Sequence, residues 1–482
     1  MELKEEKRRA KEVAKQNSEL RGENRKLRAR LKELELSNSK LREKNKELKK
    51  LTFVKQRIGN ITQVGNTGIL RHKYDELMVS LCVNIYITGG CGFRGVHKII
   101  SVLNKKLNWG LDQLPCKSTV ENWVQKAGYH LYKQIDKTKY EEDYSIIVDE
   151  CMVMGQERMI GVLGIPAVKT ESEPLKLSDA DILGIHVKPS WNGDCVSALI
   201  NTVTLEMGKA PKYVISDGGG NIRTGFVKSG LLRINDIGHQ IALFLEQIYK
   251  KDPGFIEFNN ALALNKFKEV MKPTAYLLPP QQRSIARFMN LSSVVKWAQK
   301  MIAIQPKLKP DEEKVFSYIV NHKPIIEELN HIIDFVGQIL EEIKYKGLSH
   351  LSIKNCIKKC ESIKNHVYKK AQEVIKKITD YLKSERDKLP DSKTIWHASS
   401  DIIESLFGKY KEMKSPNKLH GVTPFVLALS LYTKVDKNEF EVNVNFKTAM
   451  EKVYLRDIAS WSKTNLIENQ VRRRSTMLKT EG

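Results

Sequence analysis

The amino-acid sequence predicts a multidomain α/β protein, and three patterns along its 482 residues carry this prediction. A charged N-terminal segment repeats leucine every seventh residue. A central segment alternates strand-like and helix-like runs, and the long segment after it shows helical periodicity only. We therefore divide the chain into five predicted segments: 1–52, 68–135, 144–254, 255–395 and 396–482.

The charge balance indicates a polyanionic partner. The chain has 81 Lys and Arg residues against 57 Asp and Glu residues, a formal net charge of +24, which favours nucleic acid over a small neutral substrate. No apolar run reaches the ~18 residues of a membrane-spanning helix, so we expect no membrane partner.

Residues 1–52 carry the leucine repeat of a coiled coil. The leucines share one heptad position, and asparagine dominates the matching a position, a combination that selects a parallel two-stranded coil. The leucines are Leu20, Leu27, Leu34, Leu41 and Leu48, and the asparagines are Asn17, Asn24, Asn38 and Asn45. We therefore expect a homodimer or a higher homo-oligomer. A solitary charged helix or a disordered tail is the alternative, because the polar a positions and Gly22 weaken the seam.

Residues 68–135 are predicted to form three short helices, over Tyr74–Tyr86, Gly95–Leu107 and Ser118–Tyr132. Ser118 or Thr119 can cap the third helix. The pattern is typical of a helix-turn-helix DNA-binding domain, whose last helix enters the major groove. The residues expected to contact DNA are Lys117, Ser118, Thr119 and Asn122. A protein-interaction module without DNA contacts is the alternative.

Residues 144–254 are predicted to form a sheet with helices between its strands. The predicted strands are Tyr144–Val153, Arg158–Ile165, Asp181–Val187, Lys212–Ser216 and Leu231–Ile234, and the predicted helices are Asp194–Met207, a helix from the glycine turn to Ser229, and one from Asp236 onward. Three strands, helix, strand, helix, strand is the order of an RNase H-like sheet.

The helical segment 255–395 then looks like an insertion between the fifth strand and a final helix over Asp401–Lys411. The polar tail, which contains Arg472, Arg473 and Arg474, is expected to fray.

Three acidic residues fall where such a sheet would place metal ligands. Asp149 ends an apolar run in the first strand, where an unpaired carboxylate is costly to bury. Asp217 follows the fourth strand and precedes three glycines, which leave room for a phosphate or a metal. Glu404 lies on the final helix, and Lys411 shares its face and could hold a DNA phosphate.

Each acid has an ordinary alternative: a strand residue paired with lysine, a turn residue before glycine, and a solvated helix residue. Their joint arrangement matches the needs of two-metal phosphoryl transfer.

The arrangement resembles DDE transposases with a helical insertion, the group that includes hAT-type cut-and-paste elements, over about residues 145–415. Four motifs carry the resemblance: Asp149 in its strand, residues 216–219 around Asp217, residues 236–239 as a C/D-x-x-H motif, and residues 399–405 around Glu404. The resemblance implies that the three acids are catalytic and hold two Mg²⁺ ions per active site, replaceable by Mn²⁺ in vitro. Asp236 and His239 would support them.

The resemblance also implies that Trp297 stacks on a flipped DNA base and that Lys409 and Lys411 contact DNA. The alternatives are a core position for Trp297, and an N-cap with a surface histidine for Asp236 and His239. The front of the chain shows no zinc-binding finger and looks closer to a bacterial insertion-sequence enzyme.

The predicted function is a DNA transposase that binds the terminal inverted repeats of double-stranded DNA and catalyses metal-dependent strand cleavage and strand transfer, by a cut-and-paste route. The alternatives are a domesticated, catalytically silent transposase that binds specific DNA sequences, and another RNase H-like nuclease. We expect a cytoplasmic, nucleoid-associated protein in a prokaryote and a nuclear protein in a eukaryote.

Overall fold

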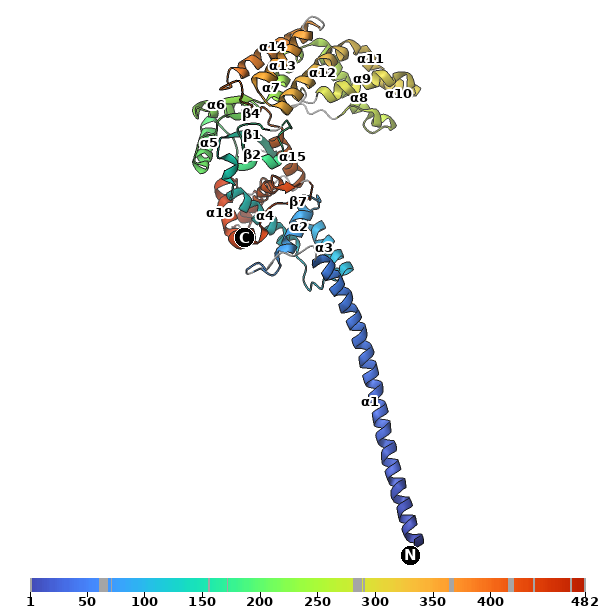
Figure 1. The fold of residues 1–482 in the computed structure, drawn as a ribbon. Helices are drawn as coiled ribbons and strands as arrows, with labels where there is room; N and C mark the ends of the chain where they lie inside the picture. The colour runs from blue at the N-terminus through green and yellow to red at the C-terminus, as the bar shows by residue number, and fades with distance from the viewer. Residues whose placement is uncertain are drawn as a thin grey trace.

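The computed structural model describes residues 2–59, 68–70, 72–154, 157–170, 172–280, 288, 291–363, 368–414, 420–436, 438–468 and 470–480. A five-stranded sheet lies near the middle of the molecule, with the long helix α1 (Glu2–Gly59) extending from one end and a group of helices at the other (Figure 1). Within the described residues, no helix combines the length and the apolar character needed to cross a bilayer.

The central sheet is mixed, with strand order β3-β2-β1-β4-β5. β1 pairs antiparallel with β2, and β2 with β3, whereas β4 runs parallel to both β1 and β5. The strands are β1 (Tyr144–Met154), β2 (Glu157–Pro166), β3 (Asp181–Lys188), β4 (Val214–Ser216) and β5 (Arg233–Asn235). The strands predicted from the sequence are therefore confirmed, with bounds that differ by at most two residues.

Helices cover both faces of the sheet, which explains why β1 is apolar without alternation. Ile146 and Val148 pack with α5 (Gly193–Met207) and α6 (Gly220–Lys228) on one face. Ile147 belongs to the larger core on the other face, which includes residues of α7 (Ile237–Tyr249) and α15 (Asp401–Met413). Figure 1 shows α5 and α6 on one side of β1 and β2, and α15 on the other.

The three predicted N-terminal helices are present but do not stand apart from the end of the chain. α4 packs against C-terminal helices, and it does so closely, because a Cβ atom at Gly128 would lie 2.3 Å from the Leu427 carbonyl oxygen. The helices of this unit are α2 (Glu76–Ile87), α3 (Phe93–Leu107), α4 (Lys117–Lys133), the 3-10 helix η6 (Pro424–Ala428), α16 (Leu429–Tyr432), α17 (Phe446–Lys452) and α18 (Leu455–Asn465). The predicted boundary at residue 135 therefore does not separate two packing units.

The described residues between Pro253 and Arg386 form helices and no strand, as the sequence predicts. They are α8 (Pro253–Glu269), α9 (Leu291–Ile304), α10 (Pro310–Phe316), α11 (Tyr318–Asn321), α12 (Lys323–Lys346), α13 (His350–Ile363) and α14 (Lys369–Arg386). α14 packs on α7, which joins this helical region to the sheet.

Two terminal segments complete the chain. In α1, the predicted heptad leucines Leu20, Leu27, Leu34 and Leu41 are exposed, whereas the side chain of Leu48 lies outside the described residues. Near the C-terminus, a short hairpin of β6 (Val435–Asp436) and β7 (Glu441–Val442) touches α2. The tail expected to fray instead contains α19 (Gln470–Thr480), because its residues include few helix breakers.

Candidate active site

Asp149 and Asp217 lie level with each other on neighbouring parallel strands. The register of β1 and β4 pairs Ile146 with Val214 and Ile147 with Ile215. Continuing that register by two residues along each chain places Asp149 beside Asp217. Both then project from the face of the sheet that carries Ile147 and Ile215, since side chains two apart in a strand share a face. The structure thus brings two of the predicted acids together at the carboxyl end of β4.

The setting of Asp149 disfavours an unpaired negative charge. Burial, followed by the nearby charge of Asp217, raises the pKa of Asp149 to about 7, and Glu404 adds to the rise. The main counteracting interaction is a hydrogen bond of 2.8 Å that the backbone N–H of Glu150 donates to the carboxylate. A cation between these acids would relieve their repulsion.

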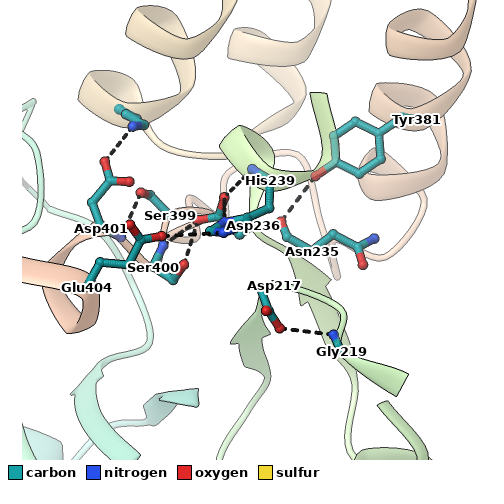
Figure 2. Close-up of polar contacts among 11 residues, drawn as sticks. Asp217, Gly219, Asn235, Asp236, His239, Tyr381, Ser399, Ser400, Asp401 and Glu404 are labelled. Atoms are coloured by element: carbon teal, nitrogen blue, oxygen red, sulfur yellow. Dashed lines mark hydrogen bonds and ion pairs between the residues drawn. The ribbon is translucent and has the colours of Figure 1, made fainter. Parts of the chain in front are cut away.

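Asp217 is held by the glycine turn that follows it. Its Oδ1 atom accepts a hydrogen bond of 3.0 Å from the backbone N–H of Gly219, as Figure 2 shows. Gly218 has a φ of +92°, a conformation that favours glycine. The three-glycine run therefore shapes the backbone beside the carboxylate, as the sequence indicates.

Asp236, which is buried, and His239, which is partly buried, form an ion pair. Asp236 is the N-cap of α7, and its Oδ1 atom accepts hydrogen bonds from the backbone N–H of His239 at 2.7 Å and from His239 Nδ1 at 3.1 Å. Burial alone would raise the pKa of Asp236, but its hydrogen bonds outweigh burial and hold the pKa below its usual value. The same pairing raises the pKa of His239 to about 9, so its imidazole is charged at neutral pH. Asp236 is thus an N-cap, as the alternative predicts. His239 differs from the surface histidine of that alternative, because it is partly buried and paired with Asp236.

This pair also fixes the helix that carries Glu404. Asp236 Oδ2 accepts hydrogen bonds from the Ser400 backbone N–H at 2.5 Å and from Ser400 Oγ at 2.9 Å. On the other side, His239 Nε2 lies 3.5 Å from Glu404 Oε1. Figure 2 shows the resulting group of Asp236, His239, Ser400 and Glu404, with Asp217 set apart from it. In the sequence Ser400 belongs to the motif of residues 399–405, but its partner could not be identified because Asp236 lies 164 residues away.

A glycine in β2 lets α15 approach the sheet. Gly161 pairs with Asp149, and a Cβ atom at position 161 would lie 2.9 Å from Cζ of Phe407. Phe407 is one helical turn after Glu404 on α15, so this close approach brings the helix of Glu404 over the strand of Asp149. Glycine at this position gave no recognisable signal in the sequence, because its role depends on a contact between distant segments.

The acids do not form a complete metal site in this arrangement. Across the described ranges, no group of three or more His, Cys, Asp or Glu side chains lies close enough together to hold an ion. Asp149 and Asp217 are level, whereas the Glu404 side chain is 46% exposed and rests against His239. Oxygen ligands nonetheless suit Mg²⁺, and two mutually repelling carboxylates fit a divalent cation. Glu404 would have to turn from His239 to join them.

The residues predicted to contact DNA lie in different surroundings. Lys411 is on the exposed face of α15 and lies next to the buried thiol of Cys151, two residues after Asp149. Lys409 instead points its ammonium group at the ring of Tyr432, 4.8 Å from the centroid. Of these two lysines, Lys411 is thus the one that lies close to the strand of Asp149.

Trp297 lies on α9, a helix that Figure 1 shows among the helices away from the sheet. Its indole N–H donates a hydrogen bond of 3.0 Å to the Leu277 carbonyl, and its ring packs on the core. The structure therefore gives Trp297 a packing role and does not bring it to the acids.

The start of α4 is open to a partner. Lys117 and Ser118 are exposed, and Thr119 and Asn122 are partly exposed, whereas one side of the helix, with Val120, Trp123 and Val124, is buried. The predicted cap is wrong, since the helix begins at Lys117 and Cys116 is its N-cap. The Cys116 Sγ atom lies 3.3 Å from Ser118 Oγ and 3.2 Å from Thr119 Oγ1.

Comparison with models of known protein families gives no match, and comparison with curated proteins gives none either. The function is therefore inferred from the residues of this chain and their geometry.

Proposed function

We propose that this protein is a DDE-type DNA transposase with an RNase H-like catalytic domain, which cuts and joins DNA strands with the help of divalent metal ions. The observation that carries the proposal is the level placement of Asp149 and Asp217 on adjacent parallel strands, with Glu404 on a helix seated over the first of them. Carboxylates in this relation suit two-metal phosphoryl transfer.

The sheet supports the same proposal. Its order, β3-β2-β1-β4-β5, with β2 alone antiparallel to its neighbours, is the order of an RNase H-like sheet. The all-helical residues 253–386 lie in the chain between α7 and α15, where the transposase resemblance places an insertion. We infer that the helical region is that insertion.

Asp149, Asp217 and Glu404 would hold two Mg²⁺ ions, and the ions would supply activation of the attacking water or 3′-hydroxyl and stabilisation of the leaving oxygen. The other residues of the site act by positioning. Asp236 fixes the ring of His239 through its Nδ1 atom and anchors Ser400 at the start of α15. The charged His239 ring then holds Glu404 by its Nε2 atom until the acid turns toward the sheet.

The rest of the chain would bind and pair the DNA ends. The net charge of +24 favours phosphate contacts, and the exposed first turn of α4 could read base edges. The exposed leucines of α1 support a parallel coiled coil between two copies of the chain, which would hold two transposon ends together.

The test is strand cleavage and joining by the purified protein, on DNA that carries the ends flanking its own gene, with Mg²⁺, Mn²⁺ or EDTA. We expect Asp217→Ala to abolish cleavage and to leave end binding intact. The matched control is Asp143→Asn, which removes an exposed carboxylate paired with Lys212 at the start of β1 and should cleave like the wild type. Equal cleavage by Asp217→Ala would refute the assignment.

A catalytically silent, DNA-binding descendant of a transposase is the second candidate. It is favoured by the position of Glu404 against His239, away from the other two acids. Specific binding of the ends without cleavage in any metal would establish it. Metal-dependent cleavage of any substrate, without preference for those ends, would instead indicate another RNase H-like nuclease.

A further inference from the structure

A basic cavity of about 410 Å³ lies at the carboxyl end of β4 and β5, directly beside Asp217. The residues that line it and bear on its chemistry are Asp217, Arg223, Arg233, Asn235, Gln240 and Lys388. The volume is within the range of sites that take a small molecule or one unit of a polymer. Neither the sequence motifs nor the proposed metal site accounts for the two arginines.

Arg233 is held in place as part of the cavity wall. Its Nε atom donates a hydrogen bond of 3.1 Å to Ser216 Oγ, and Ser216 is the last residue of β4. A Cβ atom at Gly218 would lie 2.6 Å from Nη2 of Arg233, so only glycine lets the guanidinium lie against this turn. Arg233 lines the cavity together with Asp217.

Lys388 contributes structure more than charge. Its ammonium group donates hydrogen bonds to Glu385 Oε1 at 2.8 Å and to the Arg233 carbonyl at 2.9 Å. Asn235 Nδ2 donates to the same Glu385 oxygen at 2.8 Å. Glu385 is buried, so it balances the charge of Lys388 and braces the floor of the cavity.

Arg223 adds a positive charge that no acid in the described part of the chain pairs with at close range. It lies in the first turn of α6 and is exposed. Arg223 and Arg233 line the same cavity, and burial, followed by the charge of Arg223, lowers the pKa of Arg233, as expected for neighbouring like charges. Asp217 is the acid that lines the cavity with them, and it would be engaged by metal in the proposed reaction. An anion would relieve the repulsion.

We infer that this cavity binds a backbone phosphate of a nucleic-acid strand, next to the phosphate that is cut. The inference rests on the proposed function, because it takes Asp217 as a metal ligand. Guanidinium groups bind phosphate through paired N–H donors, and the N-terminal end of α6 adds a favourable dipole. Asp217 lines this cavity and is also a ligand of the proposed metal site, so one strand would place neighbouring phosphates in the two sites.

The test measures DNA binding without cleavage. Anisotropy of a labelled duplex of the transposon end is titrated in EDTA, at several salt concentrations between about 50 and 200 mM. We expect Arg223→Gln to bind roughly fivefold to tenfold more weakly than the wild type, with a salt slope smaller by about 0.9. The control is Arg456→Gln, which removes the same charge from an exposed side chain on α18, a helix that packs on β3 at the other edge of the sheet. It should bind like the wild type.

The outcomes separate this inference from the proposed function. If Arg223→Gln and Arg456→Gln bind equally well and with equal salt slopes, the cavity does not hold a strand phosphate, even if Asp217-dependent cleavage is present. If Arg223→Gln alone weakens binding but no metal supports cleavage, the cavity assignment stands and the transposase proposal fails. If a free mononucleotide competes with the labelled duplex as effectively as unlabelled duplex does, the cavity binds a small phosphate ligand and the inference is overturned.

Discussion

Replacement of Gly161 by alanine tests the packing that brings the helix of Glu404 over the strand of Asp149. The added Cβ atom would lie 2.9 Å from Cζ and 3.1 Å from Cε1 of Phe407, closer than the ~3.5–4.0 Å of a favourable carbon contact. Overpacking of this kind costs about 1–3 kcal/mol, and relief of the glycine's conformational entropy returns about 0.5–1 kcal/mol. We therefore expect Gly161→Ala to lower the free energy of unfolding by about 0.5–2 kcal/mol.

The control is Gly184→Ala in the neighbouring strand β3. There the nearest atom, Cγ2 of Val162, would be 3.4 Å from the new Cβ, an ordinary contact. This variant should be as stable as the wild type or slightly more stable. Urea unfolding of both variants, followed by tryptophan fluorescence, gives the comparison. If Gly161→Ala is as stable as Gly184→Ala, α15 does not pack closely on the sheet as described, and the placement of the helix of Glu404 over the strand of Asp149 loses its support.

Three further predictions address the anchor, the acid sensitivity and the dimer. Asp236→Ala removes four hydrogen bonds to a buried carboxylate and should lower the free energy of unfolding by about 3–5 kcal/mol. The control Asp75→Ala removes a single capping bond from α2 and should lower it by about 0.5–2 kcal/mol. Thermal unfolding compares the two variants, and equal losses would contradict the hydrogen-bond network around Asp236. Burial lowers the pKa of His397 to about 4, below its unfolded value of 6.5. Between these two values the unfolded chain binds a proton that the folded chain does not, so the protein loses stability as the pH falls from 6.5 toward 4. Wild type should therefore lose about 2 kcal/mol more than His397→Gln between pH 7.5 and pH 5 in urea unfolding, and equal losses would contradict the burial. Leu34→Asp should convert a dimer to a monomer in sedimentation, whereas Leu36→Asp, equally exposed but off the heptad seam, should not; a wild-type monomer would refute the coiled coil.

The local elements could be predicted from the sequence because their signals are local. The apolar run before Asp149, the glycine turn after Asp217 and the N-cap at Asp236 each lie within a few residues of the element that they define. The tail is a different case. Its charged residues suggested fraying, yet they have adequate helix propensity, and the structure places α19 there.

The parts that could not be predicted depend on contacts between distant segments. The sequence around Gly128 does not indicate its contact with Leu427, and the sequence around Ser400 does not indicate its hydrogen bond with Asp236. Arg223 and Arg233 are separated by a helix and a turn, so their meeting beside Asp217 follows from the parallel pairing of β4 with β5. Sequence periodicity contains no information of this kind.

The close packing of α4 on the end of the chain has a consequence for biosynthesis. About 290 residues separate Lys133, the end of α4, from Pro424, the start of the helices that cover it. At typical rates of translation, of about 5–20 residues per second, the C-terminal helices that pack on α4 are synthesised on the order of 15–60 s after it. The apolar side of α4 therefore stays uncovered in the nascent chain for most of its synthesis. We expect chaperones to bind this segment during that time.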